Sequence, residues 1–320
     1  MGYYLGIDGG GSKTTCAVGD QGSLLATVTA GPSNITRVGK ARARETLHEA
    51  IHRACTAANI APQQLLRACI GAAGAGRSEI AGIVHKMVAE VIPGEIEVVG
   101  DMQIALAAAF GPGPGVIVIA GTGSIAYGRD AAGRAARAGG WGFAISDEGS
   151  AHWIGRSAVR AVLRAADQAG EGETKHDQAE GDRAWPALRL FRELKTTWGV
   201  DSLEQLARAA NANPDFAALF PAVLAAAESG NAVARQVLGQ ASSELIQLAE
   251  IVLRRLFPAQ PSSVLSAVPM AMAGGVFRHS RTIRELFYNG VLAANPGVIL
   301  NSEVVDPVRG ALEMARRTAS

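Results

Sequence analysis

Cysteine is scarce in this chain, and the few cysteines lack the spacing of a structural motif. Three occur among 320 residues, with no CxxC pair. An odd number without that pair excludes a disulfide framework and leaves a zinc ribbon without ligands. An excess of one charge is also lacking, since 30 Lys and Arg oppose 29 Asp and Glu for a net charge of +1. Because this balance creates no polyanion-binding field, we expect no nucleic acid partner.

Long apolar runs are absent as well. No stretch approaches the roughly 20 residues that a membrane-spanning helix needs. The N-terminal segment has no basic stretch followed by an apolar core, so it does not resemble a signal peptide. We therefore expect a cytoplasmic protein with no membrane partner. Aromatic residues make up only 5 %, whereas apolar residues reach 48 % and Gly numbers 38. This composition is typical of helices packed closely on sheets, and the length predicts two domains.

The N-terminal part of the chain predicts an α/β layer. Strands are expected at residues 4–7, 14–18, 24–29, 68–72 and 96–99. Helices are expected at residues 41–58, 78–91 and 101–110. The turn signal at residues 19–22 joins the second and third strands as a hairpin. This order predicts a mixed sheet covered by helices.

A second half repeats this opening. The run GPGPG at residues 111–115 is the strongest break in the chain. A buried strand, a glycine-rich turn with a hydroxyl and another strand then recur about a hundred residues after their first occurrence, which suggests two homologous halves facing a cleft. We expect domains at residues 1–112 and 113–305, with a C-terminal helix at 306–320 packing back on the first. Residues 171–182 are expected to form an exposed polar loop, helices to dominate residues 187–256, and a strand to cover 268–273.

The turn after the first strand resembles a P-loop only superficially. Lys13 comes one place too late for GxxxxGK[ST], and β-branched residues follow where a P-loop needs a helix. A glycine-rich β-turn remains, whose backbone N–H groups and hydroxyls can surround phosphate oxygens. Asp8 beside it is suited to hold a hydrated Mg²⁺. The phosphate-binding candidates are Gly10, Gly11, Ser12, Lys13 and Thr14. The alternative is a hairpin turn that needs glycine for steric reasons alone.

A second glycine-rich turn follows the first strand of the second half. Its residues Gly121, Thr122, Gly123 and Ser124 open a GxGxxA match, but no helix follows, so the dinucleotide-binding interpretation is weak. As a second phosphate turn it makes more sense, because two such hairpins facing each other can clamp a polyphosphate.

Several further residues could carry chemistry. Asp101 ends a buried strand and opens a helix, so it is either a helix cap or a base that accepts a proton from a substrate hydroxyl. In residues 139–150, Trp141 offers an apolar plate for a sugar ring, and Asp147 a carboxylate for its hydroxyls. The alternative for Asp147 and Glu148 is an interaction with a helix dipole. Gly274 and Gly275 either let an adenine lie against the backbone or form a plain turn.

Two patterns are interpreted as surface features. His48 and His52 match the zinc-protease pattern HExxH, but no convincing third ligand follows, so we expect a solvent-exposed coincidence. The basic run at residues 37–44 is expected to be a solvated helix face.

Taken together, the motifs resemble the BadF/BadG/BcrA/BcrD-type ATPase family of the actin-like, sugar-kinase superfamily, and within it the N-acetylglucosamine kinases. The resemblance rests on the order of LGIDGGGSKT at 5–14, GPSN at 31–34, Asp101, IAGTGS at 119–124, GGWG at 139–142, DEGSAHWIG at 147–155 and AGGVF at 273–277. It implies two ribonuclease-H-like domains around a central cleft that binds ATP, Mg²⁺ and a hexose, in a homodimeric kinase.

The resemblance also implies roles for single residues. Asp8 would stand near the metal and phosphates, and Asp101 would deprotonate the 6-hydroxyl of N-acetylglucosamine. The remaining ATP contacts would come from Ser12 and Thr122 with their turns, and from Gly274 and Gly275 at the adenosine. The sugar would be bound by Asn34, Ser124, Gly140, Trp141 and Asp147.

Two departures from the family pattern fall near the expected sugar site. Ile125 stands where related kinases often have Asn, and Ser146 where they usually have Gly. Glucosamine, N-acetylmuramic acid or another hexose therefore remains an alternative substrate. An activator-type ATPase acting on a protein partner is a further alternative. Its iron–sulfur cluster would need exposed cysteines, whereas Cys16, Cys55 and Cys69 lie in predicted strands and on a helix face.

Overall fold

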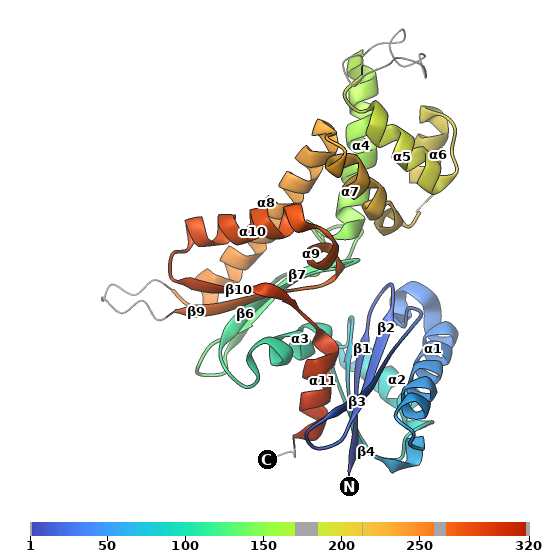
Figure 1. The fold of residues 1–320 in the computed structure, drawn as a ribbon, viewed down its shortest axis with the longest axis vertical. Helices are drawn as coiled ribbons and strands as arrows, with labels where there is room; N and C mark the ends of the chain where they lie inside the picture. The colour runs from blue at the N-terminus through green and yellow to red at the C-terminus, as the bar shows by residue number, and fades with distance from the viewer. Residues whose placement is uncertain (1, 170–184, 213, 259–266, 318–320) are drawn as a thin grey trace.

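The computed structural model describes residues 2–169, 185–212, 214–258 and 267–317, and in these ranges it contains two five-stranded mixed sheets (Figure 1). The first has the strand order β3-β2-β1-β4-β5 and the second the order β10-β9-β6-β7-β8. The segment 171–182, expected to be an exposed loop, lies outside the described residues.

The first sheet and its helices come from the N-terminal part of the chain. Its strands are β1 (Tyr3–Gly9), β2 (Thr14–Gly19), β3 (Leu24–Ala30), β4 (Leu65–Ala72) and β5 (Glu95–Gly100). The helices are α1 (Ile35–Ala57), the 3₁₀ turn η1 (Pro62–Gln64), α2 (Ser78–Ala89) and α3 (Asp101–Phe110). The predicted strands and helices of this part are confirmed, within a few residues at their ends.

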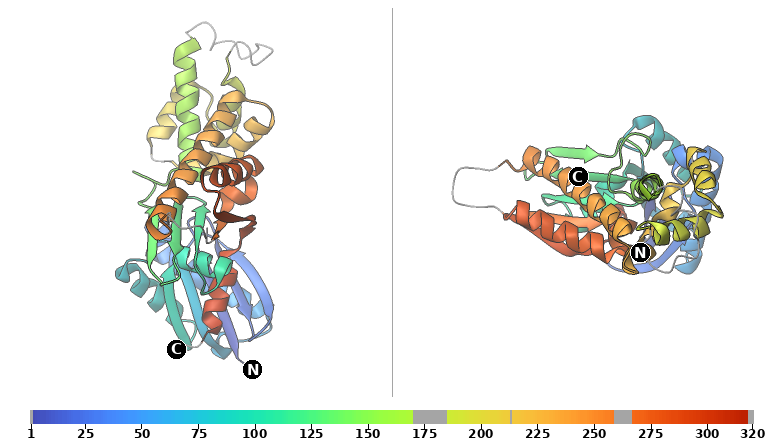
Figure 2. Two further views of the ribbon diagram at one scale, coloured as in Figure 1. Left: turned by 90° about the vertical axis from the view of Figure 1, so that its left-hand side faces the viewer. Right: turned by 90° about the horizontal axis from the view of Figure 1, so that it is seen from above.

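The second sheet carries a large helical insertion. Its strands are β6 (Gly115–Ala120), β7 (Ser124–Arg129), β8 (Ala135–Gly139), β9 (Val268–Ala273) and β10 (Val298–Val305). The helices are α4 (Ala151–Ala169), α5 (Leu188–Trp198), α6 (Leu203–Asn211), η2 (Phe216–Leu219), α7 (Phe220–Glu228), α8 (Ala232–Leu256), α9 (Gly275–His279), α10 (Arg281–Ala294) and α11 (Pro307–Arg316). The views in Figures 1 and 2 show α4 to α7 extending beyond this sheet.

The two sheets have the same topology, which confirms the repeat predicted from the sequence. In each, three strands form antiparallel hairpins, β1-β2-β3 and β6-β7-β8. Two further strands then add in parallel to the first strand of the hairpin, β4-β5 and β9-β10. Because a parallel neighbour needs a crossover connection, helices necessarily separate these later strands.

Two helices lie between the sheets and join the halves. The chain returns from β10 through α11, which packs on β1, β4 and α3, while α3 contacts strands of both sheets (Figure 1). Their packing is close because Gly310 has no side chain: a Cβ there would lie 1.9 Å from the carbonyl oxygen of Ile104. Each half otherwise has its own apolar core, and the larger one is built from the second sheet and the helical insertion.

Three local features differ from the sequence prediction. Helix α1 begins at Ile35 rather than residue 41, because the Asn34 side chain caps it and Gly39, at φ +78°, only kinks it. Strand β10 was not predicted, since its polar centre, residues 301–303, is exposed at the edge of the sheet. The Gly274–Gly275 pair does not form a plain turn, because Gly275 opens α9.

Within the described ranges, no single helix combines the length and apolarity needed to cross a membrane. The segments Phe216–Glu228 and Ala232–Leu256 meet these criteria only as a pair bent by 120°. Many of their apolar side chains belong to the core of the second half.

Candidate active site

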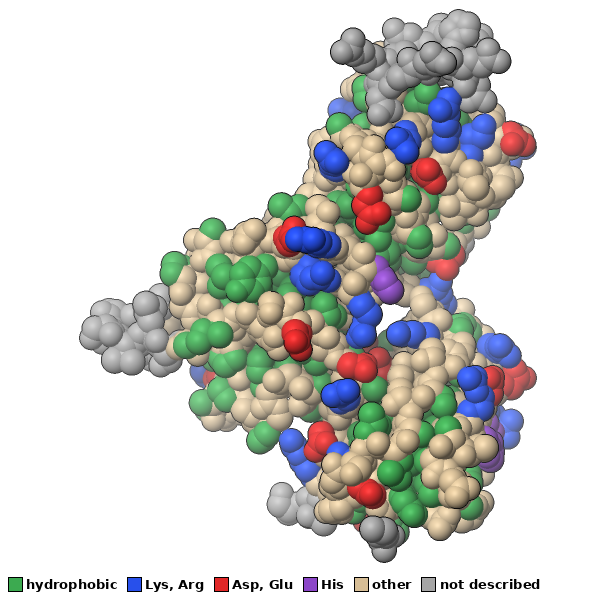
Figure 3. All heavy atoms as spheres, viewed as in Figure 1, with side chains coloured by type: hydrophobic (Ala, Val, Ile, Leu, Met, Phe, Trp, Pro, Cys, Tyr) green, Lys and Arg blue, Asp and Glu red, His purple; other side chains and the backbone are tan. Residues whose placement is uncertain are grey.

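The two glycine-rich turns meet between the halves of the molecule. The side-chain oxygens of Ser12 and Thr122 lie 2.7 Å apart, although the residues are 110 positions apart in the chain. Gly11 faces the same place, since a Cβ on it would stand 3.6 Å from Thr122 Oγ1. Figure 3 shows the surface hollowed between the upper and lower parts of the molecule, with basic and acidic side chains and a histidine around the hollow. Two hydroxyls and two turns therefore converge on one point of the cleft.

The first turn is held by the segment that leads into α1. Within the turn, the Gly10 amide donates to the Lys13 carbonyl at 3.0 Å. The Gly10 carbonyl accepts from the amides of Ser33 and Asn34 at 3.2 and 3.3 Å. The Thr14 hydroxyl donates to Ser33 Oγ at 2.7 Å. These bonds fix the turn in a shape that leaves the Ser12 side chain pointing toward the second half.

The second turn is held by the start of α4. The Gly121 amide donates to the Gly123 carbonyl at 2.8 Å, and the Gly121 carbonyl accepts from the Ala151 amide at 2.9 Å. Ser124 Oγ donates to the Glu148 carbonyl at 2.7 Å. The second turn is therefore built together with the segment that carries Asp147.

Asp8 lies at the end of β1, one residue before the first turn. Burial and the nearby charges of Asp101 and Asp306 raise its pKa to about 7, against the opposing effect of Lys13 and Arg278. A carboxylate in such an environment gains from a cation placed beside it. Among the described residues no group of three or more His, Cys, Asp or Glu side chains converges on a metal position. One carboxylate fits Mg²⁺ held mostly by water and phosphates, as this ion prefers.

Asp101 is the first residue of α3, directly after β5. Its Oδ1 accepts the Met102 amide at 3.0 Å, and the Gln103 side chain accepts the Gly100 amide at 2.9 Å. Burial raises the pKa of Asp101. Gly100 is the N-cap residue of α3, and Asp101 bonds one amide of the first turn, so its carboxylate contributes to the helix end. A carboxylate with a raised pKa is a better proton acceptor than an ordinary one.

Asp147 adopts a backbone conformation that is rare for a residue other than glycine. The φ angle of Asp147 is +64°, and the residue is only 8 % exposed to solvent. Burial raises its pKa, and the backbone amides of Ser124 and Gly142 bond to its carboxylate and oppose this rise. The charge of Asp101 raises the pKa of Asp147 further. The charge of Asp101, a residue of the first half, therefore reaches Asp147 in the second half, as does that of the neighbouring Glu148.

The loop that holds Trp141 is open to solvent. Trp141 is 68 % exposed and lies under the Arg137 guanidinium, whose carbon is 4.0 Å from the ring centre. Gly140, at φ +69°, packs on Ile125, and a Cβ on it would be 2.7 Å from Ile125 Cδ1. Asn34 uses its Oδ1 to cap α1 by accepting from the Thr36 amide at 3.0 Å. The Trp141 ring is therefore exposed to solvent and stacked on Arg137.

The second glycine pair lies beside the second turn. Gly274 has φ +99°, and a Cβ on it would be 2.3 Å from the carbonyl oxygen of Ala120, the last residue of β6. Gly275 is the first residue of α9. Glycine is therefore required at 274 by a close approach of two backbones, which also brings this loop next to Gly121.

Some cleft residues were not found from the sequence. Asp306 was not singled out as a site residue from the sequence, but its charge reaches Asp8, as does that of Arg278. Asp306 could have been found from the repeat, because it follows β10 as Asp101 follows β5. Arg37 was assigned to a solvated face, but it forms an ion pair of 2.6 Å with Asp215 of the second half. No local signal marks that pair.

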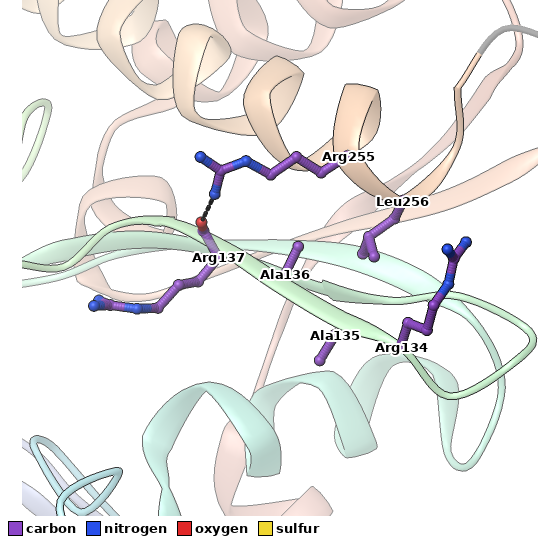
Figure 4. Close-up of a pocket in the computed structure, with 6 residues that line it drawn as sticks. All are labelled: Arg134, Ala135, Ala136, Arg137, Arg255 and Leu256. Carbon is purple, nitrogen blue, oxygen red and sulfur yellow. Dashed lines mark hydrogen bonds between the residues drawn. The ribbon is translucent and has the colours of Figure 1, made fainter.

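Two other features do not contribute to this site. His48 is the first histidine of the HExxH match, and its Nε2 lies 2.8 Å from the carbonyl oxygen of Met87. A surface pocket is lined by Arg134, Ala135, Ala136, Arg137, Arg255 and Leu256, between β8 and the end of α8 (Figure 4). Its arginines already have partners, including a 2.8 Å bond from Arg255 to the Arg137 carbonyl, and no predicted site residue lines it.

The two sheets of equal topology, with their glycine-rich turns meeting in the cleft, define a two-domain kinase fold of the actin-like and sugar-kinase type. The chain belongs to the BadF/BadG/BcrA/BcrD ATPase family, which it matches over residues 5–315. The family resemblance stated from the motifs is thereby confirmed.

Three similar proteins cover nearly the whole chain. An N-acetylmuramic acid/N-acetylglucosamine kinase of Clostridium acetobutylicum is 34 % identical, with 99 % of both chains covered. An N-acetyl-D-glucosamine kinase of Dictyostelium discoideum is 28 % identical, covering 98 % of this chain and 97 % of its own. The crystal structure of a putative N-acetylglucosamine kinase from Chromobacterium violaceum has a TM-score of 0.73 at 25 % identity, with 98 % and 99 % coverage.

Proposed function

We propose that this chain transfers the γ-phosphoryl group of ATP to the 6-hydroxyl of N-acetylglucosamine. The observation that carries the proposal is the contact of Ser12 with Thr122, with Asp8, Asp101 and Asp147 beside the same turns. Phosphate-binding turns and a buried carboxylate base are the parts that phosphoryl transfer to a hydroxyl requires. The amino-sugar kinases among its relatives support the substrate class.

In the proposed reaction, Asp101 accepts the proton of the 6-hydroxyl as its oxygen attacks the γ-phosphorus. The new bond joins that oxygen to phosphorus, and the bond from phosphorus to the β,γ-bridging oxygen breaks, which leaves ADP. Burial keeps the Asp101 carboxylate basic, and its bond to the Met102 amide holds its direction. This combination of position and basicity is what a general base needs.

The nucleotide would lie across the second turn, with its phosphates between the two turns. Gly10, Gly11 and Lys13 would bind phosphate from the first turn, and Gly121 and Gly123 from the second. Thr14, expected to bind phosphate, is buried and instead holds the turn through Ser33. The adenosine would lie against Gly274 and Gly275, where the backbone of Gly274 closely approaches that of Ala120. Asp8 would hold Mg²⁺ through water, and the ion would neutralise phosphate charge.

The sugar would lie between the start of α1 and the segment 139–150. Asp147 offers a buried carboxylate for its hydroxyls, with Asn34, Ser124 and Gly140 around it. Trp141 would cover the ring. Ile125 packs behind Gly140, so it would influence the fit of the acylamino group without offering it a hydrogen bond. N-acetylmuramic acid and glucosamine are the alternative substrates that this site leaves open.

An activator-type ATPase is less well supported. Cys16, Cys55 and Cys69 are all buried. Burial also raises the pKa of Cys55 to about 11 and that of Cys69 to about 12. Thiols in this state are poor cluster ligands, because metals bind the thiolate.

The test is ADP release from Mg-ATP with N-acetylglucosamine, N-acetylmuramic acid, glucosamine, N-acetylmannosamine and glucose, followed by NMR of the product. Strong stimulation by N-acetylglucosamine with phosphate on carbon 6 supports the proposal. Stimulation by another sugar alone corrects the substrate. No stimulation by any of them, with ATP still bound, contradicts the kinase function. Light scattering on the same sample tests the homodimer, which we propose from the family resemblance.

A further inference from the structure

Arg37 reaches from the first half to the point where the two turns meet. It belongs to the first turn of α1, and its Nη1 lies 3.6 Å from the position that a Cβ on Gly11 would occupy. Thr122 Oγ1 lies at the same distance from that position. The guanidinium is therefore beside both phosphate turns, with its side chain 28 % exposed.

Asp215 holds the other side of this guanidinium. Its Oδ2 accepts from Arg37 Nη2 at 2.6 Å, while its Oδ1 accepts from the Ala217 amide at 3.1 Å. Asp215 thus caps η2 and binds Arg37 at once. The next residue, Phe216, packs edge-on against His152 at 5.2 Å between ring centres. The His152 amide in turn donates to the Thr122 carbonyl at 3.4 Å. A chain of contacts therefore connects the second turn to the group that orients Arg37.

We propose that Arg37 is a catalytic residue that binds the phosphoryl group during its transfer, and that Asp215 is the residue that positions it. This inference rests on the proposed function. A guanidinium has five N–H donors in a planar fork that suits phosphate oxygens. Arg37 Nη2 donates to Asp215, so the side of the guanidinium that carries Nη1 is directed toward the glycine-rich turn at Gly11. Its charge would offset the negative charge on the phosphoryl oxygens as the bond to ADP breaks.

The location of the pair also links this cation to the arrangement of the halves. Arg37 comes from α1 and Asp215 from the helical insertion of the second half. The guanidinium is oriented only when these two segments lie together.

The kinetic test compares variants of this pair under saturating Mg-ATP. We expect Arg37→Gln to lower kcat by about 10²–10³-fold, as the loss of one group that stabilises transition-state charge does. Arg37→Lys should restore part of kcat, because it keeps the charge without the fork. Asp215→Asn keeps an Asx cap for η2 but loses its charge, and should lower kcat by roughly fivefold. Adding Asp215→Asn to Arg37→Gln should lower kcat little further, because Asp215 acts through Arg37.

The matched control is Arg53→Gln. Arg53 lies on the same helix, in an exposed pair with Glu49 at 2.8 Å, where both side chains are 51 % exposed. The kcat of Arg53→Gln should equal that of the wild type. If Arg37→Gln retains kcat within about threefold of the control while thermal unfolding is unchanged, the inference is overturned, since a lost catalytic cation costs far more.

Nucleotide binding gives a readout that does not need sugar phosphorylation. Calorimetry with Mg-ADP and with a non-hydrolysable Mg-ATP analogue should show that Arg37→Gln weakens the analogue more than ADP. If the wild type phosphorylates no sugar, the proposed function fails. The role of Arg37 is then decided by whether Arg37→Gln weakens binding of the ATP analogue more than binding of ADP. Equal binding of both nucleotides by Arg37→Gln and wild type contradicts it.

A comparison of two substrates separates the phosphoryl role from recognition of an acidic sugar. Arg37→Gln should reduce kcat to the same extent with N-acetylglucosamine and with N-acetylmuramic acid, whose lactyl group carries a carboxylate. Loss confined to N-acetylmuramic acid would show that Arg37 binds that carboxylate, and would overturn the inference. If Arg37→Gln does not fold, Arg37→Lys and Asp215→Asn supply the same comparisons.

Discussion

The two halves share one strand order but differ in the chemistry at equivalent places. Asp8 is the next-to-last residue of β1 that pairs with β2. The equivalent residue of the second half, next to last in the pairing of β6 with β7, is Ile119. The half-buried carboxylate that would hold a cation is therefore present on one side only. The repeat built the architecture twice, whereas the phosphate-transfer chemistry depends on residues in which the halves differ.

A second equivalence concerns the ends of the last strands. Asp101 follows β5 and opens α3, and Asp306 follows β10 and precedes α11. Both charges reach Asp8. They differ in their setting, because Asp101 bonds to its neighbouring amide and also influences Asp147, which belongs to the second half. In the proposed function, Asp101 is therefore the strand-end aspartate that acts on the sugar hydroxyl beside the phosphates.

The third difference is the insertion from α4 to α8. The first half has the single helix α1 at the corresponding place between its hairpin and its next strand. The insertion brings Asp215 to Arg37 and supplies the helix that holds the second turn. Four predictions follow this comparison from the largest expected effect to the smallest.

The largest effect is expected for Asp101→Asn, which tests whether the two aspartates at strand ends contribute differently to turnover. We expect turnover to fall by about 10²–10⁴-fold, because a general base contributes that much, with ATP-analogue binding almost unchanged. Asp306→Asn is the matched variant and should lose far less. Steady-state kinetics and calorimetry measure both. Equal losses in the two variants would show that the halves contribute symmetrically.

Asp147→Asn tests whether the sugar is bound by the second half. Asn tolerates the left-handed backbone at this position, so the change removes the charge without adding backbone strain. Sugar binding should weaken by roughly tenfold or more, the scale of a hydrogen bond to a charged group, while ATP binding stays the same. Asp130→Asn is the control, since Asp130 is a buried acid of the same half that bonds to Arg134 at 2.7 Å. Equal loss of sugar and ATP binding would indicate a structural role for Asp147.

The contact between the turns can be measured by a double-mutant cycle. Ser12→Ala and Thr122→Val should each weaken binding of the ATP analogue, and the double variant should lose less than the sum of the two. The expected coupling is about 0.5–1.5 kcal/mol, as for a neutral hydrogen bond. Strict additivity in calorimetry would mean that the two hydroxyls bind the nucleotide independently.

The buried histidine and the buried aspartates should also respond oppositely to pH, which is the smallest of the four effects. Burial and the charge of Arg156 lower the pKa of His152 in the second half. The unfolded chain then binds more protons than the folded one, so the free energy of unfolding falls as pH drops below about 6.5, the ordinary His pKa. The raised pKa of Asp101 acts in the opposite sense, since ionising it becomes costly as pH rises.

Urea unfolding of the wild type and His152→Asn between pH 7 and 5 measures this effect. The wild type should lose more stability on acidification than the variant. A constant difference between the two across this range would show that His152 does not titrate on unfolding.

Much of the fold was predictable because local signals agree with the tertiary structure. Hairpin turns, buried β-branched strands and the glycine-proline break mark the repeat without reference to distant residues. Strand β10 was missed because an exposed edge strand need not show an apolar pattern. The basic run on α1 was correctly placed on a helix, but its first member, Arg37, pairs with Asp215, 178 positions away.

The sequence by itself determined the two halves, the glycine-rich turns and the aspartates at strand ends, because each depends on neighbouring residues and on backbone conformations that few residue types adopt. The tertiary structure alone decided which of these lie together: Ser12 with Thr122, Asp101 with Asp8 and Asp147, and Arg37 with Asp215. Their meeting depends on how α3 and α11 pack between the sheets and on the contact of the insertion with α1 through Asp215. Packing of that kind sums many weak contacts across the chain, which no local pattern records.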